Sequence, residues 1–176
     1  MSTTASPAES RDLIIERLLG DTGEPAKVHS AARRLAERSA PAIARFLTEM
    51  LPEQVFVEVA EVKLGRMADA KAGKANQAMA VAMTPTSPDG LVMTLDPQAI
   101  AILVNVLFGG DPSREVAPID RDLSSIELGV VTMVFQDIGR AVNAQGPDGG
   151  LGVKLPVAEA ITGTEMKKHV FRDGPS

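Results

Sequence analysis

The stretch that most constrains the fold is residues 96–143, where two capped apolar helices flank a diglycine loop. Asp96 is suited to cap a helix N-terminus, and Pro97 suits the first helical position. Apolar residues fill almost every position from 99 to 108, which predicts a short helix buried on most sides. Gly109 and Gly110 then end this helix, because glycine accepts the left-handed backbone common at helix C-termini.

A second helix follows a polar loop at 111–122. Ser124 and Glu127 have the spacing of a capping box, in which each side chain bonds the backbone N–H of the other residue. Apolar residues then recur at helical spacing, at Leu128, Val131, Val134, Phe135, Ile138 and Val142. The pattern predicts a long helix with one buried face.

Two further helices are predicted before this stretch. We expect residues 1–26 to be a flexible N-terminal segment with a short helix at 11–19. A long amphipathic helix follows at 28–50. Because Pro41 lacks a backbone N–H, we expect a kink there or a break that Ser39 caps again.

Period-two alternation of side chains predicts strands between and after the helices. The alternating segments are 55–60, 78–83 and 91–95, and we expect residues 153–161 to open another strand. Ser87-Pro88-Asp89-Gly90 predicts a hairpin turn between the second and third strands. The order indicates an α+β domain at 27–161, with helices packed on an antiparallel sheet, and a C-terminal tail at 162–176.

Composition excludes several function classes. The formal charge of −5 argues against nucleic acid as a partner, since its binding needs a concentrated basic surface. The chain has no cysteine, which excludes disulfides and thiolate metal sites. Its two histidines, His29 and His169, lie near opposite ends, so we expect no cofactor and no metal. No apolar run approaches the length of a membrane-spanning helix.

The sequence Leu107-Phe108-Gly109-Gly110-Asp111, followed by an acidic loop and the capped helix, resembles the middle domain of the flagellar motor switch protein FliM. The same core fold occurs in the chemotaxis phosphatases CheC and CheX. The resemblance implies a CheC-like α/β/α layered domain built as a pseudo-symmetric repeat. We expect that repeat to be incomplete, because the chain ends soon after the first long helix of its second half.

The resemblance also implies two partner-binding segments. The loop at Gly109, Gly110, Asp111 and Pro112 would dock a FliG-like rotor protein, with Pro112 replacing the family's last loop glycine and stiffening the loop. The N-terminal helix would bind the phosphorylated response regulator CheY. Its candidate residues are Asp12, Leu13, Ile14, Leu18 and Leu19. The alternative is that this helix packs on the helix that follows it.

A phosphatase of this fold places a Glu and an Asn three residues apart on an exposed helix. Here Glu127 is followed by Val130, and Glu37 by Ala40, so neither pair has the amide that orients water. We therefore expect a non-enzymatic adaptor in the switch ring, beside copies of itself and other ring subunits, at the cytoplasmic face of the inner membrane. The alternatives are a CheC-like phosphatase relative without its amides and a stand-alone scaffold.

Overall fold

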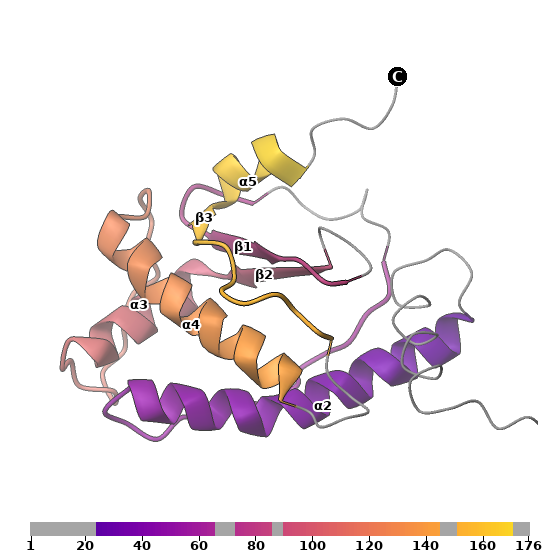
Figure 1. Cartoon of the computed structure of the whole chain (residues 1–176). Coiled ribbons are helices and arrows are strands. Elements are labelled where there is room, and N and C mark those ends of the chain that lie inside the picture. The colour runs from indigo at the N-terminus through magenta and orange to yellow at the C-terminus, as the bar shows by residue number, and fades with distance from the viewer. Residues whose placement is uncertain (1–23, 66–72, 86–89, 145–150, 171–176) are drawn as a thin grey trace, which may run out of the picture.

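The computed structural model describes residues 24–65, 73–85, 90–144 and 151–170. This part of the chain is a mixed α+β fold in which four helices pack with a small three-stranded antiparallel sheet (Figure 1). The elements are α2 (Pro25–Met50), β1 (Ala78–Ala82), β2 (Leu91–Leu95), α3 (Pro97–Leu107), α4 (Ser125–Asn143), β3 (Ile161–Thr162) and α5 (Gly163–Val170). The predicted α+β class is confirmed at this level.

The sheet has the strand order β2-β1-β3, and both pairs are antiparallel. Ala78 pairs with Leu95 and Ala82 with Leu91, so the two strands predicted at 78–83 and 91–95 are confirmed as neighbours. The third strand is only two residues long and pairs with the beginning of β1. Residues 86–89, which include most of the predicted hairpin turn, lie outside the described part.

The core lies where α4 packs on β1. The side chains of Ala78, Ala80 and Ala82 are completely or almost completely buried on one face of the strand. Because alanine is small, this face lets a helix come close, and Val131 and Phe135 of α4 belong to the same core cluster. Figure 1 shows α4 between the sheet and α2. The predicted buried face of α4 is confirmed.

The predicted helix caps are also confirmed. Asp96 Oδ1 accepts a hydrogen bond of 2.8 Å from the Ala99 N–H. Ser124 and Glu127 form both halves of the capping box at the start of α4. The predicted break near Pro41 is wrong, since α2 runs from Pro25 to Met50 with the proline inside it.

The strand predicted at 55–60 does not form. Val55, Val57 and Val59 are half-buried and alternate with exposed residues, as predicted, but the backbone belongs to no sheet. Its ends are fixed instead to α2. The Val55 N–H donates to Thr48 Oγ1 (3.0 Å), and His29 Nε2 donates to the Val62 carbonyl (2.9 Å). The alternation therefore reflects side chains that face α2 and not strand pairing.

The strand predicted at 153–161 is confined to its last residue, Ile161, which begins β3. The segment before it follows α4, whose side chains bond its backbone. The Gln136 amide forms two hydrogen bonds with Val157, and the Asn143 amide two with Val153. A side-chain amide offers one donor and one acceptor, as a neighbouring strand would, so the segment needs no ladder here.

The described fold continues beyond residue 161. Residues 163–170, at the start of the region expected to be a tail, form α5, which contacts β1 and β3. Met166 anchors this helix with only 3% of its surface exposed. The short helix expected at 11–19 lies outside the described residues. In the described part, no helix has the length and apolar character needed to cross a membrane.

Candidate functional site

The loop after α3 begins with a helix-ending motif. The Gly110 N–H donates to the Asn105 carbonyl (2.8 Å), and the Gly109 N–H donates to the Val106 carbonyl (3.1 Å). Gly109 has a φ of 82°, in the left-handed region. These features define a Schellman motif, which satisfies the last carbonyls of the helix. The predicted helix stop is therefore confirmed, and Gly109 is the residue that carries the left-handed turn.

Gly110 has a different role from Gly109. A Cβ on Gly109 would meet no atom within 4 Å, whereas one on Gly110 would lie 2.2 Å from Asn105 Oδ1. Glycine is therefore needed at the first position for its backbone conformation. At the second position a larger residue would require the Asn105 side chain to move.

Asp111 organises the next turn of the loop. Its Oδ1 accepts hydrogen bonds from the Ser113 hydroxyl (2.7 Å) and the Ser113 N–H (2.9 Å), and its carbonyl accepts one from the Arg114 N–H (3.2 Å). The two bonds from Ser113 hold the pKa of the Asp111 carboxyl below its ordinary value. The loop thus carries a negative charge on an ordered turn, and Pro112 lies exposed within it.

Two apolar side chains of the α3 region face solvent, which corrects the prediction of a helix buried on most sides. Phe108 is 68% exposed and Ile102 is 45% exposed. The helix packs against α4 through one face, where Ile100 joins the core, and Phe108 lies at the C-cap where the chain turns. The sequence signal for Phe108 was its place as the last apolar residue before the diglycine.

A groove of about 330 Å³ separates α3 from the loop that follows it. Ile102 and Asn105 line one side of it, and residues 112–116 line the other. Gln98 lies in the groove and its Nε2 donates to the Val116 carbonyl (2.7 Å), which ties the loop to the helix. Pro112 lines this groove and also belongs to a surface that we call the loop face, which consists of Phe108, Gly109, Gly110, Asp111 and Pro112.

Glu127 is held in a structural arrangement at the start of α4. Its carboxylate accepts two hydrogen bonds of 2.9 Å from the Arg121 guanidinium and one of 2.7 Å from the Ser124 N–H. The Arg121 bonds lower the pKa of Glu127 to about 2, against the effect of burial. Val130, three residues on, is 5% exposed. The pair weighed as a phosphatase site is thus a buried ion-paired cap followed by a core residue.

The remaining site predictions concern the N-terminal segment and metal binding. The candidate response-regulator residues, Asp12, Leu13, Ile14, Leu18 and Leu19, lie outside the described residues. Within the described ranges, no group of three metal-ligating side chains gathers at one place. No protein-family model, no curated protein and no solved structure matches the chain.

Proposed function

We propose that this protein is a non-enzymatic subunit of the bacterial flagellar motor switch, and that its loop face docks a FliG-like rotor protein. The observation that carries the proposal is the exposed Phe108 beside the ordered turn from Gly109 to Asp111. These are the residues on which the resemblance to FliM rests.

The loop face has the physical properties of a docking surface. Its backbone is fixed by the Schellman motif and by the Asp111–Ser113 turn, so binding would require little further ordering. Aromatic side chains, phenylalanine among them, are enriched in the core of protein interfaces relative to the rest of the surface. Pro112 adds stiffness because its ring fixes φ.

The same proposal covers the remaining partners. The N-terminal residues Asp12 to Leu19 would bind a phosphorylated CheY-like response regulator. Neighbouring copies of the chain would stand side by side in the ring, at the cytoplasmic face of the inner membrane, reached through partners. The element order of helix, strands, short helix and long helix supports a CheC-like layered fold.

The surroundings of Glu127 support an adaptor over a phosphatase. The Glu127 carboxylate accepts hydrogen bonds from Arg121 and Ser124, so it is held in the helix cap. Val130 lies in the core, at the position where the phosphatases have an exposed amide. Phosphate release from phosphorylated CheY tests this directly. We expect the protein to leave the spontaneous rate unchanged, and an accelerated rate would favour the phosphatase alternative.

Titration of labelled FliG with the parent protein and surface variants tests the docking face. We expect Phe108→Ser to weaken binding about tenfold or more, since a buried aromatic anchor contributes over 1 kcal/mol. Phe56→Ser is the matched control, because Phe56 is 79% exposed and lies outside the loop face. It should bind like the parent.

Asp111→Asn separates charge from loop shape, because an Asn oxygen can still accept the bonds from Ser113. Weaker binding by this variant and by Asp111→Arg would indicate that FliG recognises the negative charge of Asp111. Failure of the parent protein to bind FliG would replace the motor-switch proposal with the stand-alone scaffold.

A further inference from the structure

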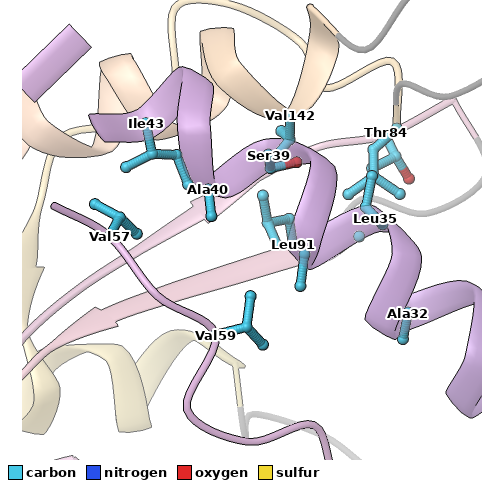
Figure 2. Close-up of a pocket in the computed structure, with 13 residues that line it drawn as sticks. Ala32, Leu35, Ser39, Ala40, Ile43, Val57, Val59, Thr84, Leu91 and Val142 are labelled. Carbon is cyan, nitrogen blue, oxygen red and sulfur yellow. The ribbon is translucent and has the colours of Figure 1, made fainter. Parts of the chain in front are cut away.

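A second hollow lies on the opposite side of α2 from its solvent-exposed charges. This α2 cavity has a volume of about 420 Å³ (Figure 2). One helix supplies most of its wall, through Ala32, Leu35, Ala36, Ser39, Ala40 and Ile43. Val57 and Val59 line it from the segment that follows α2, Leu91 lines it from β2, and Val142 lines it from α4. The cavity therefore lies where four segments of the fold approach one another without closing.

The walls of the α2 cavity are almost wholly apolar. The polar side chains among them are Ser39 and Thr84. Ser39 is 2% exposed, and its hydroxyl has no hydrogen-bond partner in the described part of the chain. Figure 2 shows Ser39 between Ala40 and Val142. Protein cores are normally packed without voids larger than a water molecule. An apolar hollow of this size therefore indicates an apolar occupant.

We propose that the N-terminal segment Leu13–Leu19 of the same chain occupies the α2 cavity. Its apolar residues recur at helical spacing, at Leu13, Ile14, Leu18 and Leu19, so they would form one face of a helix. That face matches the apolar walls of the cavity.

The covalent connection to α2 is long enough for the N-terminal segment to reach the α2 cavity. Residues 20–24 separate Leu19 from α2, and five extended residues span up to about 17 Å. The first cavity residue, Ala32, lies about 10 Å along the helix from Pro25. A short tether gives its segment a local concentration on the order of millimolar, which favours it over a second copy or a separate protein. The segment is also the proposed response-regulator peptide, so it would bind CheY only after leaving the cavity.

Engineered cysteines test the contact in the full chain, which has no native cysteine. Leu18→Cys with Ala36→Cys places one thiol on the segment and one in the cavity wall. Leu18→Cys with Glu37→Cys is the matched control, since Glu37 is next in sequence but its side chain is 55% exposed. With a short bis-maleimide, we expect the first pair to crosslink within one chain about tenfold faster or more. Equal rates, or crosslinks formed only between chains, would overturn the proposal.

An apolar fluorescent dye gives a second readout. The parent chain should bind the dye weakly, and the full-length Ile14→Asp, Leu18→Asp double variant should bind it strongly because the cavity is then open. Arg17→Ser, a change on the polar side of the same segment, should behave like the parent. The proposal fails if the parent binds the dye as strongly as the double variant, since the cavity would then be empty in the intact chain.

Discussion

The side-chain amide of Gln136 forms two hydrogen bonds with the backbone of Val157: Nε2 donates to the carbonyl (2.7 Å), and Oε1 accepts from the N–H (2.8 Å). Asn143 binds Val153 in the same way, and Thr132 Oγ1 accepts from the Ala160 N–H (3.0 Å). Three side chains of one helix thus bond the backbone of residues 153–160, where the Lys154 N–H also donates to the Met83 carbonyl (2.8 Å).

Gln136→Met tests how much this arrangement contributes. Methionine has a similar length but offers neither the donor nor the acceptor, so both backbone groups of Val157 lose their partner. We expect the free energy of unfolding to fall by about 2–4 kcal/mol, from two partly buried groups left unsatisfied. Urea unfolding of the parent and the variant would measure this difference in the free energy of unfolding.

Two variants control for this result. Gln136→Glu keeps an acceptor for the Val157 N–H and should lose less stability than Gln136→Met at a pH where the carboxylate is ionised. Gln54→Met, at an exposed position, should change stability by less than about 0.5 kcal/mol. A Gln136→Met variant as stable as Gln54→Met would show that water replaces the amide without cost.

The helix caps could be predicted because they depend on neighbours in sequence. Asp96 and the Ser124–Glu127 pair bond backbone groups within three residues. The strands were harder, because alternation shows which side chains are buried and not which backbone lies alongside. At 55–60 the alternation follows from Val57 and Val59 facing the cavity beside α2, and at 153–160 the backbone bonds α4 side chains, so neither pattern required a sheet.

At the candidate site, local chemistry was again easier to predict than packing. The turn at Gly109 follows from the intrinsic freedom of glycine. The exposure of Phe108 could not be predicted in this way, because the same apolar run is expected for a helix covered on one side or on all sides. The use of the Ala78 face of β1 for the core is also a packing outcome, decided by the close approach of α4.

The second prediction concerns acid stability. The folded-state pKa of Glu127 is about 2, below its ordinary value of 4.5, because Arg121 and Ser124 bond the ionised form. Its contribution is therefore fully present above pH 4.5 and is lost as the pH falls from 4.5 toward 2. We expect a loss on the order of 2 kcal/mol over this window, reduced by the solvent exposure of Arg121.

Urea midpoints measured between pH 7 and pH 3 would show this loss. Arg121→Met should raise the pKa of Glu127 and make the stability of the protein less dependent on pH in this range, since it removes the largest cause of the shift. Arg114→Met is the control, because Arg114 is also exposed but does not bond Glu127. If the parent and Arg121→Met lost stability equally on acidification, the ion pair would not be the cause.

The third prediction separates the two loop glycines. Gly109→Ala should cost about 1–2 kcal/mol because alanine resists the left-handed backbone. Gly110→Ala should also destabilise, but through contact with the Asn105 side chain. Adding Asn105→Ala should therefore rescue Gly110→Ala and leave Gly109→Ala unimproved, which a double-mutant cycle by urea unfolding would measure. Equal rescue of both variants would contradict these separate roles.

The last prediction compares two hydroxyl groups on neighbouring helices. Ser39 Oγ is buried without a partner in the described fold, so Ser39→Ala removes an unsatisfied polar group. We expect this variant to be as stable as the parent or more stable by about 1 kcal/mol. Thr132→Val, in contrast, should destabilise by about 1–3 kcal/mol, because the Thr132 hydroxyl accepts from the Ala160 N–H and donates to the Leu128 carbonyl. Thermal and urea unfolding of both variants would check the opposite signs. A clear loss in Ser39→Ala would mean that the Ser39 hydroxyl bonds a group of the intact chain, and the N-terminal segment in the α2 cavity would be the first place to look for it.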